Sequence, residues 1–129
     1  MELIDRFKEL YGFVFEDALV NEIVSISRVR KVKEGEVLID IGEQIQVMPL
    51  LLQGAIKVMR EDKEGDELLL YFLENGDTCT MTLTCSMGGL KSEIRTIAET
   101  DAEMLLVPVA KMEEWLIKFK SWRGFVLES

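Results

Sequence analysis

Histidine is absent from this chain of 129 residues. The missing imidazole removes the commonest metal ligand in proteins and the commonest general base in enzymes. Long apolar runs are absent too, since no stretch approaches the roughly 20 residues that a membrane-spanning helix needs. We therefore predict a protein with no catalytic residues, no metal site, no cofactor and no membrane partner.

Basic residues are scarce relative to acidic ones. The chain has 15 Lys and Arg against 24 Asp and Glu, which gives a net charge of −9. Nucleic-acid binding depends on clustered Lys and Arg that neutralise phosphates, so this chain by itself is not expected to bind DNA. The first residues, "MELIDRFKEL", also lack the basic and then apolar layout of a secretory signal, which predicts a cytoplasmic protein.

Cysteine occurs only twice, at Cys79 and Cys85. An iron–sulfur cluster needs about four thiolates, so a single chain of this composition excludes one. In the cytoplasm the two thiols are expected to be reduced. Two interpretations stay open: a redox pair whose disulfide would move the segment between them, or two small buried apolar side chains.

The length fits one domain over residues 1–129, large enough to bury a core without disulfides. Apolar residues recur at three-to-four spacing in the first 26 residues, which predicts two short helices. They are Leu3, Ile4, Phe7, Leu10 and Tyr11, then Phe15, Leu19, Val20, Ile23 and Val24.

Residues 27–108 change to short β-type runs separated by turn residues. The "KEGD" stretch at 63–66 predicts a hairpin loop, and "ENGD" at 74–77 carries an Asn-Gly pair that accepts positive φ. Strands of this length and spacing predict an antiparallel sandwich or barrel.

The helical period returns in residues 109–129, after Pro108. Apolar residues recur there at alternating intervals of three and four residues, and we call them the apolar seam. This spacing is typical both of a truncated coiled-coil heptad pattern and of a helix that faces the core. The seam consists of Met112, Trp115, Phe119, Trp122 and Val126.

The order of these elements resembles the sensor domain of the Crp/Fnr transcription regulators, which is similar to cyclic nucleotide-binding domains. The likeness rests on four stretches in order: "KEGEVLIDIGE", "LLLQGAIKVM", "LLLYFLENGD" and "AETDAEMLLVP". It implies a mainly β fold with flanking helices, an eight-stranded antiparallel roll of the jelly-roll or double-stranded β-helix kind.

The resemblance also implies a function, that of an effector-sensing regulatory domain. Family members usually continue into a dimerisation helix and a C-terminal helix-turn-helix that binds DNA. This chain stops at Ser129, near where that helix would begin. We therefore expect DNA to be bound only through a domain outside this chain, and a homodimer in the full-length protein.

Two residue pairs hold the ligand in family members that bind cyclic nucleotides: a Gly-Glu for the ribose and an Arg-Ser or Arg-Ala for the cyclic phosphate. Here Thr80 and Met81 stand at the first pair, and Ser92 and Glu93 at the second. A buried phosphate needs a guanidinium to offset its desolvation. Arg95, three residues beyond Ser92, should point to the opposite face of a strand. The ligand is therefore not expected to be cyclic AMP.

The pocket that this alignment predicts is polar and almost uncharged, and it suits a small neutral or weakly polar effector. Its candidate residues are Thr78, Thr80, Met81, Thr82, Thr84, Ser92 and Glu93. Three alternatives stay open. The segment could only pack the roll interior, it could bind a cyclic nucleotide through non-standard contacts, or the chain could be a scaffold with Trp115 and Trp122 exposed.

Overall fold

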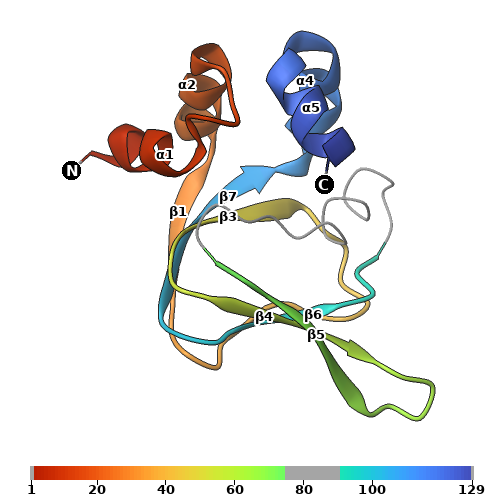
Figure 1. Ribbon diagram of the computed structural model, residues 1–129. Coiled ribbons are helices and arrows are strands. Elements are labelled where there is room, and N and C mark those ends of the chain that lie inside the picture. The colour runs from red at the N-terminus through yellow and green to blue at the C-terminus, as the bar shows by residue number, and fades with distance from the viewer. Residues whose placement is uncertain (1, 75–90, 129) are drawn as a thin grey trace.

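The computed structural model describes residues 2–74 and 91–128, and in them helices at both ends of the chain flank a set of strands (Figure 1). The elements in order are α1 (Leu3–Tyr11), α2 (Asp17–Ile26), β1 (Arg28–Val32), β2 (Val37–Ile39), β3 (Val47–Gln53), β4 (Ile56–Glu61), β5 (Glu67–Leu73), β6 (Arg95–Ala98), β7 (Ala102–Pro108), the 3-10 turn η1 (Val109–Lys111), α4 (Met112–Lys118) and α5 (Lys120–Glu128).

The predicted fold class is confirmed, since the strands form two antiparallel sheets with helices beside them. Their orders are β1-β7-β3 and β2-β6-β4-β5. The predicted hairpin at 63–66 joins β4 to β5, and Gly65 adopts φ 86° in its loop. The Asn-Gly pair of the second predicted turn lies outside the described residues.

The two predicted N-terminal helices are also confirmed, and their apolar faces are buried. Phe7 and Tyr11 on α1 meet edge to face at 4.9 Å between ring centroids, and Phe15 stacks on Tyr11 at 5.9 Å. The Tyr11 hydroxyl donates a hydrogen bond of 3.0 Å to the Leu51 carbonyl of β3. This bond satisfies a buried polar group and fixes α1 against the sheet.

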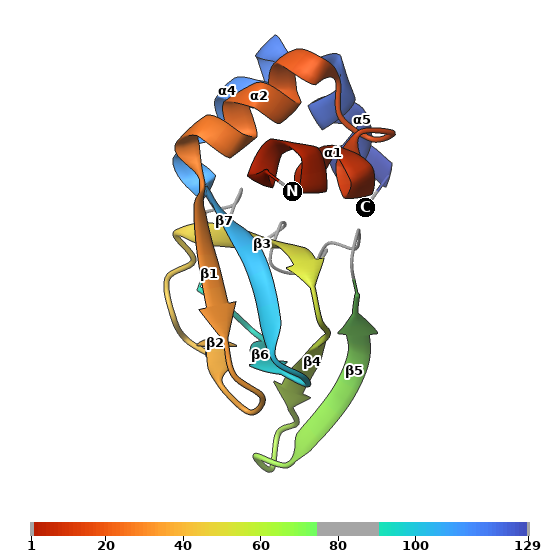
Figure 2. The same cartoon turned by 90° about the vertical axis from the view of Figure 1, so that its left-hand side faces the viewer.

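The β1-β7-β3 sheet is the central layer of the molecule. Met48 and Leu50 of β3 belong to the core beneath the helices, whereas Leu51 belongs to a second core between the two sheets. Strand β7 alternates likewise, with Leu105 toward the helices and Met104 toward the other sheet. Figures 1 and 2 show the resulting order of layers, with helices on one side of this sheet and the second sheet on the other.

The apolar seam of residues 112–126 faces the protein's own core. Met112, Trp115 and Trp122 are fully buried, so the expectation of exposed tryptophans under the scaffold alternative is wrong. Two helices carry the seam, because Phe119 leaves the helical conformation at φ −122° and ψ 116°. Within the described part of the chain, no helix has the length and apolarity to cross a membrane.

Candidate functional site

The core between the two sheets, where the resemblance places an effector, is aliphatic, and we call it the aliphatic wall. The buried apolar residues there are Val32, Leu51, Ile56, Val58, Leu73, Ile94, Ala98, Ala102, Met104 and Leu106. Apart from Tyr11 and the two tryptophans of the helical layer, the buried residues of the described ranges that carry a side-chain N or O atom are Ser92 and Thr96, and none is charged. This wall therefore offers an effector apolar contact and very few hydrogen bonds.

Ser92 is buried, and its hydroxyl serves the local backbone. The Oγ atom donates to the Ile94 carbonyl at 2.8 Å and accepts from the Ile94 amide at 3.2 Å. The Ser92 amide donates to the Glu43 carbonyl, and its carbonyl accepts from the Gly42 amide, both at 2.8 Å. Because a hydroxyl has one hydrogen, Ser92 could offer a ligand only a lone pair in this arrangement.

The other predicted site residues are less informative. Glu93 is exposed. The remaining candidates lie outside the described residues, so their roles stay predictions. They are Thr78, Thr80, Met81, Thr82 and Thr84, together with the two possible redox residues Cys79 and Cys85.

Thr96 is a buried polar residue that the sequence prediction missed. It alternates with Arg95 along β6 and shares a face with the buried Ala98. Its Oγ1 atom accepts a hydrogen bond of 3.1 Å from the Ile39 amide. The alternation of large and small residues in "RTIA" is the sequence signal that could have identified it.

Arg95 lies on the outer face of its sheet, the side that was expected, although β6 begins at Arg95 and does not include Ser92. Its Nε donates to Asp40 Oδ1 at 2.7 Å, and its Nη2 lies 3.3 Å from Glu61 Oε1. A further ion pair joins Nη1 to Glu67. Hydrogen bonds from Arg95 and from the Ile41 amide hold the pKa of Asp40 below its usual value.

The position of Arg95 decides what charge the roll interior can accept. Its guanidinium is engaged with carboxylates from three segments outside the interior, and the pKa of Arg95 is raised mainly by its hydrogen bond to Asp40. No Arg or Lys of the described ranges is buried. The described wall therefore supplies no cation for a phosphate.

Long-range polar contacts attach the helical layer to the sheet and join the N-terminal helices to the C-terminal ones. Arg6 of α1 forms an ion pair with Glu103 of β7. Glu22 of α2 accepts hydrogen bonds from Trp115 Nε1 and, at 3.0 Å, from Lys118 Nζ. These pairs are 93 to 97 residues apart in the chain, and no local sequence pattern predicts them.

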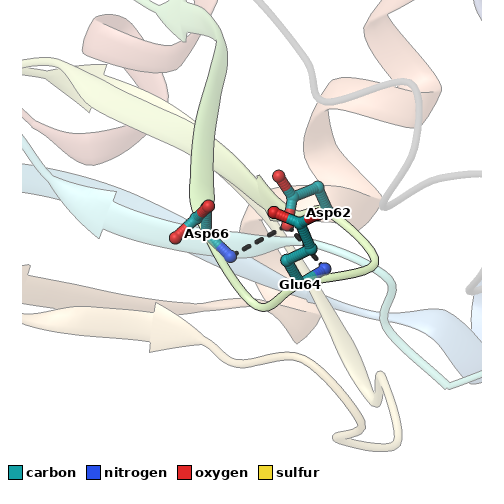
Figure 3. A group of neighbouring side chains, drawn as sticks. All are labelled: Asp62, Glu64 and Asp66. Atoms are coloured by element: carbon teal, nitrogen blue, oxygen red, sulfur yellow. Dashed lines mark hydrogen bonds between the residues drawn. The ribbon is translucent and has the colours of Figure 1, made fainter.

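Three carboxylates gather in the β4–β5 hairpin loop, at Asp62, Glu64 and Asp66 (Figure 3). All three are exposed, and their oxygens lie within 4.8 Å of one another. Asp62 Oδ1 accepts hydrogen bonds from the Glu64 and Asp66 amides, both at 2.9 Å, which closes the loop. Exposed acids of this kind are common without an ion, and we interpret the cluster as part of the turn.

A cavity of about 290 Å³ opens near the end of β1. Neither Ser92 nor Glu93 is among its described lining residues. Its lining residues are Lys31, Val32, Lys33, Gln53, Asp101, Ala102 and Glu103.

The sequence matches one known family over most of its length. Residues 29–118 match the family profile described as "Cyclic nucleotide-binding domain". No curated protein sequence matches the chain significantly.

Solved structures with this fold include several bacterial regulators. The sensor domain of the transcriptional regulator DNR from Pseudomonas aeruginosa superposes with a TM-score of 0.82 at 16% identity, over 99% of this chain and 88% of its own. A Ruegeria pomeroyi protein assigned as cyclic nucleotide binding gives 0.80 at 15% identity, over 98% and 57%. A Eubacterium rectale protein assigned to the crp/fnr family of transcriptional regulators gives 0.76 at 19% identity, over 92% and 55%. The chain thus spans little more than half the length of the last two.

Proposed function

Because the chain belongs to the cyclic nucleotide-binding domain family, we propose that it is the effector-sensing domain of a Crp/Fnr-type bacterial transcription regulator. The structural likeness to the sensor domain of DNR and to the Eubacterium rectale protein supports this assignment. The domain acts by binding and not by catalysis. Its DNA contacts are made by a separate helix-turn-helix domain, in a cytoplasmic homodimer.

The effector we propose is a small neutral or weakly polar molecule and not cyclic AMP. The observation that carries this proposal is the outward position of Arg95, whose guanidinium is engaged with Asp40, Glu61 and Glu67. A cyclic phosphate moved from water to an aliphatic interior loses several kcal/mol of solvation unless a cation meets it. An uncharged molecule loses far less, and it gains from apolar contact with the roll.

The central sheet supplies a physical route from the roll to the helices. Neighbouring residues of β7, such as Met104 and Leu105, face the effector side and the helix side of one strand. Close-packed interiors transmit small displacements because they have little free volume. An effector that shifts β3 or β7 would therefore shift the packing under Trp115 and Trp122, and with it the pose of α5.

Ligand-induced stabilisation tests the effector class. A ligand present at about 100 times its Kd should raise the free energy of unfolding by about 2.7 kcal/mol, which thermal denaturation detects readily. We expect no shift with cyclic AMP or cyclic GMP, and a shift with one or more neutral molecules from a metabolite panel. Saturable cyclic AMP binding at micromolar concentration in calorimetry would refute the proposed effector class.

Tryptophan emission tests the transmission. Both tryptophans of the chain lie in the helical layer and none lies in the roll. An effector bound in the roll should therefore change the tryptophan emission without contacting either tryptophan. A ligand that stabilises the domain but leaves the emission unchanged would argue against transmission through the central sheet.

A further inference from the structure

The cavity of about 290 Å³ lies where β1 and β3 end and β7 begins, and we call it the polar cavity. The helices cover the other end of this sheet, and β1 and β7 continue beyond them (Figures 1 and 2). Small-molecule sites typically have volumes of roughly 300–1,000 Å³. The polar cavity is at the lower end of this range, and it therefore suits a small metabolite.

The lining of the polar cavity carries two positive and two negative side chains. Lys31 and Lys33 lie at the end of β1, and Asp101 and Glu103 lie at the start of β7. Because these formal charges cancel, the lining as a whole favours neither a phosphate nor a metal cation. A ligand that carries one charge of each sign can satisfy both strands.

Glu103 is an anion that the structure already holds in place. Its carboxylate forms an ion pair with Arg6 of α1, and its side chain is 14% exposed. The hydrogen bond from Arg6 is the main reason that the pKa of Glu103 is lowered. Lys31 lies directly opposite Glu103 in the sheet, but it forms no ion pair within the described residues. Its ammonium group is therefore available to a ligand.

The second pair of charges in the polar cavity is held only weakly. Lys33 Nζ lies 3.9 Å from Asp101 Oδ2, and the two side chains are 86% and 68% exposed. Exposed pairs of this kind contribute little to stability because water screens them. Asp101 stays in position without Lys33, since its Oδ1 atom accepts a hydrogen bond of 2.9 Å from the Glu34 amide. A ligand can therefore replace Lys33 as the partner of Asp101.

Gln53 adds a neutral donor and acceptor from the third strand. It lies opposite Glu103 in the pairing of β3 with β7, so Lys31 and Gln53 stand on either side of that carboxylate. Its carboxamide makes no hydrogen bond in the part of the chain that the structure describes. Val32 and Ala102 supply the apolar part of the lining. A free ammonium group and a free carboxamide thus flank a fixed carboxylate.

We propose that the polar cavity binds a free amino acid through its zwitterionic head. The carboxylate of the amino acid would meet Lys31, and its ammonium group would meet Asp101 and Glu103. Hydrogen bonds between charged groups are stronger than neutral ones, so both ends contribute to recognition. Gln53 would bond a polar side chain. The inference does not depend on the proposed function, because this ligand is charged at both ends and the effector proposed for the roll is not.

Amide chemical shifts of the whole chain test the proposal in separate titrations with each of the twenty common L-amino acids. We expect at least one to bind with a Kd of about 1 mM or below, and to shift residues 31–33, 53 and 101–103 most. The N-acetyl and the amide derivatives of that amino acid each lack one charge. Both should bind at least about tenfold more weakly, because each leaves one charged group of the site without its partner.

Substitutions locate the two contacts. Lys31→Met removes the cation but keeps an apolar stem, so it should weaken binding by about tenfold or more. Its matched control is Lys120→Met, an exposed lysine of α5 that should leave binding unchanged. Asp101→Asn keeps an acceptor for the Glu34 amide, so it tests the ammonium contact even if Lys31→Met alters the sheet. Its control is Asp17→Asn, at an exposed position of α2.

Four outcomes would overturn the inference. No saturable shift with any of the twenty amino acids would remove the site. Shifts centred away from the polar cavity would place the ligand elsewhere. Equal binding of either singly charged derivative would show that the site does not read both charges. Binding unchanged in both Lys31→Met and Asp101→Asn would refute the assigned contacts. Failure of the effector assays, which report on the roll, would affect none of these results.

Discussion

Gly54, in the turn between β3 and β4, gives the sharpest test of the packing. It adopts φ 92°, and a Cβ atom there would lie 2.5 Å from the Asp101 carbonyl oxygen and 2.8 Å from the Ala102 Cβ. Both neighbours belong to the start of β7 or its preceding turn, and neither is the end of a flexible side chain. Gly54→Ala must therefore move the backbone of one turn against the other.

The magnitude follows from two terms. A left-handed conformation costs an alanine about 1–2 kcal/mol. Overpacking against fixed neighbours adds about 1–3 kcal/mol. Gly54→Ala should therefore lower the free energy of unfolding by about 2–5 kcal/mol, a large share of the roughly 5–15 kcal/mol typical of a domain.

Gly65→Ala is the matched control. Gly65 has φ 86°, almost the same conformation, but nothing lies within 4 Å of its added Cβ. It should show only the conformational term of about 1–2 kcal/mol. Urea denaturation measures both variants, with the m-value as a check that the transition stays two-state. Equal destabilisation by the two substitutions would refute the close approach of the turn at Gly54 to β7.

Three further predictions concern side chains that join the layers. Trp115→Phe should cost about 1–2 kcal/mol more than Trp122→Phe in urea denaturation, because Trp115 Nε1 donates to a carboxylate of α2, whereas the buried Trp122 Nε1 has no partner among the described residues. Arg6 lowers the pKa of Glu103 from its ordinary 4.5, so this pair stabilises the fold above about pH 4.5 and the stabilisation is lost as the pH falls through the lower folded value. Arg6→Gln should therefore be less stable than the parent near neutral pH, and urea titrations should show the difference shrinking in acid. Arg95→Gln should speed amide hydrogen exchange in β5 and leave cyclic AMP still unbound, whereas unchanged exchange would show that the ion cluster does not hold the hairpin.

Local sequence patterns were sufficient to predict much of the fold. Three-to-four apolar spacing identified α1 and α2, and turn residues placed the β4–β5 hairpin. Arg95 lies on the outer face of β6, the expected side, although the expectation assumed one strand through Ser92 and Arg95. Because β6 begins at Arg95, alternation along the strand does not connect these two residues. The expectation about the effector rested on Ser92 and Glu93, which stand where the resemblance implies an Arg-containing pair.

Other features could not be predicted locally. The apolar seam of residues 112–126 keeps its three-to-four spacing across Phe119. No Gly or Pro stands next to Phe119 to mark the break between α4 and α5. The run "ELLLYFL" is typical of a strand buried on both faces, yet β5 is largely exposed because it lies at the edge of the described sheet. Ion pairs such as Arg6 with Glu103 depend on which distant segments meet.

Strands β3 and β7 pack against a hydrophobic core on both of their faces. Buried residues of the two strands belong alternately to the core between the sheets and to the core beneath the terminal helices. Under the proposed function, a substitution on these strands that alters effector specificity should also disturb the packing of the terminal helices. Variants with a new specificity should therefore carry compensating changes one residue away, on the reverse of the same strand.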